Sequence, residues 1–242
     1  MLSDLWDRAT STAVPLSWQV SLFLGALAVV VTWSPVGYRV VRHLVTLLHE
    51  AGHALVAAAV GRRLSSIRLH ADTSGVTLSR GRPRGPGMVA MVAAGYPAPA
   101  LAGLGGAFLL GAGYAAGLLW ALVLTCAVLL LLVRNLYGLW VVAVTGALVA
   151  WLSWAASPPV VTGAAYLVAW SLLLAAPRSV VELQRQRRRP RQPRGRAGSG
   201  GASDADQLAQ LTGLPALVWV GFFWLVCAAA LAVGGMLLLR NA

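Results

Sequence analysis

Long apolar runs separated by short polar segments make up most of this chain. Each run approaches the length of about 20 residues that a helix needs to cross a hydrocarbon core about 30 Å thick. The runs fall at about 18–34, 40–60, 88–111, 115–133, 138–155, 159–176 and 215–239. This pattern predicts an all-α polytopic membrane protein with about six or seven transmembrane helices. The sequence GYPAP at 95–99 predicts a break within the third run.

A small β-hairpin is expected in the polar connection that follows the second apolar run. Ile67 and Leu69 alternate with polar neighbours there, and Val76 and Leu78 do the same. A period of two is typical of a β-strand with one buried face. The sequence therefore predicts a hairpin at about 66–79.

A second long connection divides the chain into three parts. Its residues are rich in arginine, proline and glycine, which predicts a disordered cytoplasmic loop at 177–202. The part before it, 1–176, is the predicted membrane core. The part after it, 203–242, contains an SDA segment and the last apolar run.

Composition supports the membrane interpretation. The 242 residues are 58% hydrophobic and 11% charged, whereas soluble domains carry about 25% charged residues. The net charge of +12 comes entirely from arginine, because the chain has no lysine. No basic region is interleaved with aromatic residues, so we do not expect nucleic acid as a partner.

The arginines gather in the two long connections beside apolar runs. The positive-inside rule places such loops in the cytoplasm, and seven spans would put both loops and the N-terminus on that side. A composition rich in alanine and arginine is typical of a high-GC bacterial genome. The expected location is therefore the bacterial plasma membrane, with the lipid bilayer as a partner.

The second apolar run contains HEAGH, a polar pattern in an otherwise apolar helix. His49 and His53 are four residues apart, so both imidazoles lie on one helix face and can reach one ion. Glu50 lies about 100° around the helix and can act as a general base without being a ligand. From this composition an HExxH pattern arises by chance about 5 × 10⁻⁴ times per chain. A carboxylate at the centre of a spanning helix costs about 2.5–3.5 kcal/mol on insertion scales, which a bound zinc ion would offset.

A catalytic zinc ion usually has three protein ligands and one open position. Asp204 and Asp206 are candidates for the third ligand, since they begin a helical segment before the last apolar run. A purely structural role would also explain these two aspartates, because Ser203 can cap this helix and acids in its first turn meet the positive end of the helix dipole. Gly213 and Pro215 predict a break that would let the segment fold inward.

Several motifs together resemble the site-2 protease family of intramembrane zinc metalloproteases. The resemblance extends over about residues 38 to 225 and is closest to the compact bacterial branch called M50B-like peptidases. The motifs are HEAGHALVAAAVG at 49–61, SGVTLSRG at 74–81, AAGYPAPALAG at 93–103, VRNLYG at 133–138 and SDADQLAQLTGLPALVW at 203–219.

This resemblance implies one zinc ion per chain, held by the two histidines and an aspartate on a later helix. The SDA segment of the compact branch corresponds to Ser203-Asp204-Ala205, so Asp204 is the expected ligand and Asp206 the alternative. The NPDG or LDG context of other family members does not occur here. Asn135, in VRNLYG, could donate to a developing oxyanion or to the substrate backbone, or could simply cap a helix.

The predicted function is hydrolysis of peptide bonds in or near transmembrane segments of other membrane proteins, as in regulated intramembrane proteolysis. Glu50 would be the catalytic base. The first alternative is a membrane transporter or an ion or proton relay that uses the same His and Glu side chains. The second is a degenerate peptidase that binds zinc or partners without cleavage.

Overall fold

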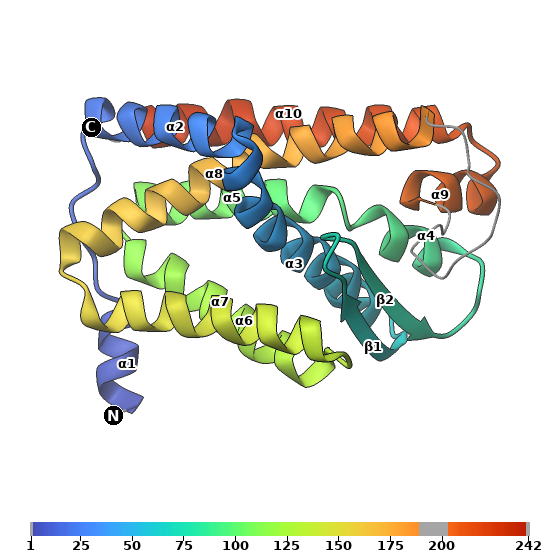
Figure 1. Cartoon of the computed structure of the whole chain (residues 1–242), viewed down its shortest axis with the longest axis horizontal. Helices are drawn as coiled ribbons and strands as arrows, with labels where there is room; N and C mark the ends of the chain where they lie inside the picture. The colour runs from blue at the N-terminus through green and yellow to red at the C-terminus, as the bar shows by residue number, and fades with distance from the viewer. Residues whose placement is uncertain (1, 189–202, 241–242) are drawn as a thin grey trace.

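The computed structural model describes residues 2–188 and 203–240, which form a bundle of helices with one small β-sheet (Figure 1). The elements in chain order are α1 (Leu2–Ala9), α2 (Trp18–Trp33), α3 (Pro35–Ala59), β1 (Arg63–Leu69), β2 (Gly75–Arg80), α4 (Pro86–Ala93), α5 (Pro97–Gly111), α6 (Ala115–Leu132), α7 (Leu136–Ala155), α8 (Pro158–Arg188), α9 (Asp204–Thr212) and α10 (Ala216–Arg240).

Four of these helices, α6, α7, α8 and α10, are each long and apolar enough to cross a membrane. Two bent pairs, α2 with α3 and α4 with α5, bring the number to six if each pair is one span. The all-α membrane architecture is thus confirmed, with at most six spans among the described residues. The hydropathy pattern predicted separate spans at 18–34 and 40–60, but in the structure the two helices meet at a bend of 98° at Ser34.

The bend between α2 and α3 has a local cause. Ser34 ends α2 and caps α3, since its hydroxyl accepts a hydrogen bond from the N–H of Gly37. Pro35 is the first residue of α3, where its missing N–H costs no helical hydrogen bond. The predicted break at 95–99 is confirmed as well, because α4 and α5 meet there at 63°.

The predicted hairpin is also confirmed. β1 and β2 are antiparallel, with Ile67 opposite Thr77. The other edge of β1 is covered by the residues before α7: Val133 forms a parallel bridge with Ile67, and the N–H of Arg134 donates to the Ile67 carbonyl at 2.9 Å. Within the described chain, β2 therefore has the open edge of this sheet.

The predicted disordered loop at 177–202 is wrong in its first part. α8 continues as a helix to Arg188, and 189–202 lie outside the described residues. The charged composition of this part hid an amphipathic pattern, because Val180 and Leu183 are buried against the bundle. Glu182 also pairs with Arg178 one turn earlier, which favours the helix.

α8 is the central helix of the bundle and packs on α2, α5 and α10. Tyr166 and Leu173 of α8 and Phe223 of α10 are fully buried in this core. The short helix α4 contacts both α3 and α9. This short helix therefore links the HEAGH helix to the segment that contains Asp204, although the two are about 150 residues apart in sequence.

Candidate metal centre

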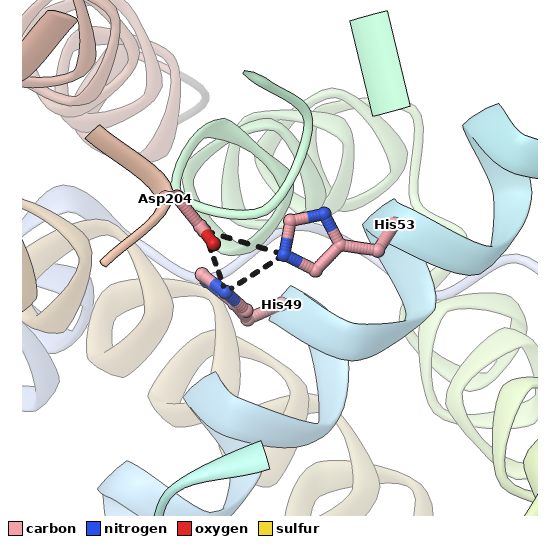
Figure 2. A group of neighbouring side chains, drawn as sticks. All are labelled: His49, His53 and Asp204. Atoms are coloured by element: carbon pink, nitrogen blue, oxygen red, sulfur yellow. Dashed lines mark hydrogen bonds and ion pairs between the residues drawn. The ribbon is translucent and has the colours of Figure 1, made fainter. Parts of the chain in front are cut away.

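Three side chains from two distant parts of the chain converge at one point (Figure 2). His49 and His53 project from α3, and Asp204 is the first residue of α9. Oδ2 of Asp204 lies 3.2 Å from Nε2 of His49 and 3.3 Å from Nε2 of His53, and the two Nε2 atoms are 3.1 Å apart. In the described part of the chain, this is the one group of three or more His, Cys, Asp or Glu side chains with metal-binding spacing.

The three ligand atoms fit a zinc ion. With Zn–N and Zn–O bonds of about 2.0–2.1 Å, neighbouring ligand atoms of a tetrahedral site lie about 3.3–3.4 Å apart. The observed separations of 3.1, 3.2 and 3.3 Å form a nearly equilateral triangle of this size. A triangle of three ligands leaves the fourth tetrahedral position open, as in catalytic zinc sites.

The chemistry of the donor atoms also calls for a cation. Nδ1 of His53 lies 2.7 Å from the carbonyl oxygen of Met91, which can only accept, so the proton of the neutral ring is on Nδ1. The Nε2 lone pair of His53 then faces Oδ2 of Asp204, which is also an acceptor. Oδ2 of Asp204 is buried and receives no hydrogen bond among the described residues. A metal ion relieves this crowding of lone pairs, and the Met91 carbonyl is a typical partner of a ligating histidine.

Two residues from the break between α4 and α5 shape the space around the imidazoles. A Cβ on Gly95 would lie 2.5 Å from Nε2 of His53 and 2.6 Å from Cε1 of His49. The ring of Tyr96 meets that of His49 edge to face, with centroids 4.8 Å apart. The sequence interpretation treated this break as architecture and missed both contacts. The one sequence feature that pointed to these contacts was the GYPAP motif at 95–99, which breaks the helix.

Glu50 lies beside the three ligands but is not one of them. Its carboxylate is buried, and Oε2 accepts a hydrogen bond from the hydroxyl of Thr77 in β2. Gly75 packs directly on the same carboxylate, so no side chain fits at that position of β2. The hairpin thus orients the glutamate, which the one-dimensional pattern HEAGH could not indicate.

The site opens into a cavity of about 590 Å³. His49, Glu50, His53 and Asp204 all line it, and its walls extend to Arg42 of α3 and to residues 75–79 of β2. Such a volume is sufficient for several residues of an extended peptide.

Asp206, the alternative ligand, has a structural role. Its carboxylate accepts hydrogen bonds from the N–H and the hydroxyl of Ser203, and the Ser203 hydroxyl accepts from the N–H of Asp206, which completes a capping box. Arg187 of α8 forms an ion pair with it at 3.0 Å. Burial opposes ionisation of Asp206, but hydrogen bonds from Ser203 and Arg187 lower the pKa of its carboxyl. The structure therefore brings Asp204, and not Asp206, to the histidines.

Asn135 does not reach this cavity. Its Nδ2 donates to the carbonyl of Leu69 at 2.6 Å, and its Oδ1 accepts from the N–H of Leu69 at 3.1 Å. The side-chain amide thus continues the pairing along the covered edge of β1. The residue sits at the N-cap position of α7 without a side-chain cap bond. We find no contact that supports its predicted role toward an oxyanion.

In a comparison with known protein families, the model of the family described as "Peptidase M50B-like" matches residues 22–234 of this chain. Comparisons with curated proteins and with solved structures gave no significant match. The matched range includes every residue of the metal centre and all six candidate spans except the ends of the outermost helices. This chain therefore belongs to the Peptidase M50B-like family of membrane peptidases, as its motifs and the geometry of its site had indicated.

Proposed function

We propose that this protein is a zinc-dependent intramembrane endopeptidase that hydrolyses peptide bonds in or near transmembrane segments of other membrane proteins. One observation carries the proposal: His49, His53 and Asp204 form a triangle of zinc-ligand size beside a buried glutamate, in a cavity between membrane-type helices. Family membership agrees with this chemistry.

Each residue of the site has a distinct task. Zinc bound by the three ligands would act as a Lewis acid toward water and toward the peptide carbonyl. Glu50 accepts the proton of the attacking water and then donates it to the amine that leaves. Thr77 holds the carboxylate of Glu50 by its hydrogen bond, so that the base does not turn away. The Met91 carbonyl keeps the proton of His53 on Nδ1 and leaves Nε2 to the metal.

The hairpin offers a means of binding the substrate. A protease attacks an extended peptide, so a helical substrate must first be unwound. β2 lines the cavity and has the open edge of the sheet, which suits pairing with an extended segment. Proline substitutions at successive positions of β2 test this idea. Where the lost N–H pointed away from β1, toward the open edge, cleavage should be abolished and zinc content should stay constant. Full cleavage by every proline variant would contradict it.

The orientation follows from the arginine-rich connections. The hairpin and α9 both contribute to the cavity, so the ends of both long connections lie at the same end of the molecule (Figure 1). The positive-inside rule then places this end in the cytoplasm of a bacterial cell, next to the plasma membrane. Arg82→Cys, in a background without Cys126 and Cys227, should react with a membrane-impermeant maleimide only after the membrane is opened.

The decisive experiment uses Glu50→Gln. A single-span reporter protein with a different tag at each end is reconstituted with the purified enzyme in liposomes, and the fragments are measured. Wild type should cleave the reporter, and Glu50→Gln should bind zinc equally but lose at least about 100-fold in rate. Glu182→Gln makes the same chemical change in the wall of the same cavity and should retain cleavage.

The proton-relay alternative predicts a different result. A relay would move protons across liposomes, cleave nothing in wild type, and lose proton flux with Glu50→Gln. If wild type cleaves no reporter from a panel of single-span proteins with weakened helices but does conduct protons, the peptidase proposal is wrong.

A further inference from the structure

A second groove lies on the outer surface, between the end of α8 and the beginning of α10, away from the metal centre. Its volume is about 480 Å³. The residues that line it form one stripe on each helix: Val180, Val181, Gln184, Arg185 and Arg188 on α8, and Leu217, Val220, Gly221 and Trp224 on α10. Both stripes have the spacing of a single helix face.

One end of the groove is cationic. Arg185 and Arg188 are exposed there, and neither forms an ion pair with any described residue. Arg187 between them points elsewhere, toward Asp206 of α9. The two guanidinium groups thus present a positive charge that no described carboxylate neutralises, which favours an anionic ligand.

The α10 side of the groove is apolar and open to the surroundings. Leu217 is 62% exposed and Trp224 is 50% exposed. Between them, a Cβ on Gly221 would meet no atom within 4 Å, so this glycine creates a notch rather than a close helix contact. The α10 side of the groove therefore offers open apolar space of a kind that suits an acyl chain.

The groove extends from the first turn of the last candidate span toward the middle of that span. α10 begins at Ala216, so Leu217 is in its first turn. Arg185 and Arg188 line the groove at its open, charged end. Trp224 is seven residues after Leu217 in α10, about 10 Å further into the membrane at 1.5 Å per residue.

We propose that this groove binds one anionic phospholipid. The phosphate and the anionic headgroup contact Arg185 and Arg188, and an acyl chain lies in the notch at Gly221 against Trp224. Basic pockets between transmembrane helices are known sites for anionic headgroups. This site is independent of the metal centre and of the proposed peptidase activity.

The test measures quenching of Trp224 by brominated lipids in the full-length protein in detergent. The difference in fluorescence between wild type and Trp224→Phe isolates this residue from the other nine tryptophans. Brominated phosphatidylglycerol should quench Trp224 at a lower concentration than brominated phosphatidylcholine does. Arg185→Gln with Arg188→Gln should weaken the phosphatidylglycerol interaction about 30-fold, which corresponds to about 1 kcal/mol for each arginine, and should leave phosphatidylcholine unaffected.

Two matched controls separate a site from general effects. Arg82→Gln with Arg84→Gln removes the same charge from another exposed segment and should not change the quenching. Gly221→Leu should fill the notch and abolish the selective quenching, whereas Gly105→Leu, where a Cβ also meets nothing within 4 Å, should not.

Three results would overturn the proposal. Equal quenching by the two lipids would show that no anionic site exists. An equal loss in the Arg82 and Arg84 double variant would show that surface charge alone attracts the lipid. Displacement of the lipid by millimolar inorganic phosphate would show that the groove binds small anions and has no specific site for the acyl chain.

Discussion

Replacement of Gly95 by alanine should disable the metal centre although the backbone can accept it. The new Cβ would lie 2.5 Å from Nε2 of His53, whereas real Cβ atoms rarely approach another atom more closely than 3.0–3.4 Å. The imidazole would have to move by roughly 0.5–1 Å, and the hydrogen bond from its Nδ1 to Met91 opposes that movement. Zinc–ligand bonds tolerate only about 0.2 Å. We therefore expect zinc affinity to fall about 10- to 100-fold, or about 1.4–2.8 kcal/mol.

Competition with a fluorescent zinc chelator would measure this change on purified protein in detergent. Gly105→Ala is the matched control, because a Cβ there meets nothing within 4 Å, and it should bind zinc as wild type does. The thermal unfolding midpoint of the zinc-free proteins shows whether both variants fold. If folded Gly95→Ala binds zinc as tightly as wild type does, the site is not shaped closely around a metal ion.

Three further substitutions test the supporting contacts. Asp206→Asn removes the capping carboxylate of α9 and should weaken zinc affinity about 10-fold, although one zinc per chain still binds at saturation. If the variant bound no zinc at saturation, Asp206 would be a ligand. Thr77→Val removes the hydrogen bond that orients Glu50 and should lower the cleavage rate about 10-fold with zinc content unchanged; an unchanged rate would show that the bond is not needed. Asn135→Ala removes both hydrogen bonds to Leu69 and should speed hydrogen exchange in β1 without changing zinc content; a loss of cleavage with normal exchange would instead support the oxyanion role.

Much of the architecture could be predicted because it depends on local patterns. Helix length and hydropathy indicated nearly every helix, and alternation of apolar and polar residues indicated the hairpin. The first two runs became one bent pair because Ser34 caps the second helix at a sharp angle, which hydropathy does not record. The end of α8 was missed because arginines dominate its composition, although Val180 and Leu183 follow a helical period.

The metal centre could be predicted only in part, for a similar reason. His49, Glu50 and His53 lie within one turn, so their spacing alone defines a metal-binding face. Asp204 and Asp206 are chemically equivalent as residues, so spacing alone does not separate them. The family resemblance favoured Asp204, and the fold brings that residue to the histidines. Contacts across long sequence distances, such as those of Gly95, depend on packing and have no local pattern.

Zinc content per chain, measured after purification without chelators, shows directly whether His49, His53 and Asp204 hold a metal ion. We predict about one zinc per chain in wild type and in Asp206→Ala, and none in His53→Ala or Asp204→Ala. This result would establish the metal centre and name its third ligand. Wild-type protein without zinc would contradict the proposed metal centre, and zinc retained by Asp204→Ala but lost by Asp206→Ala would contradict its third ligand.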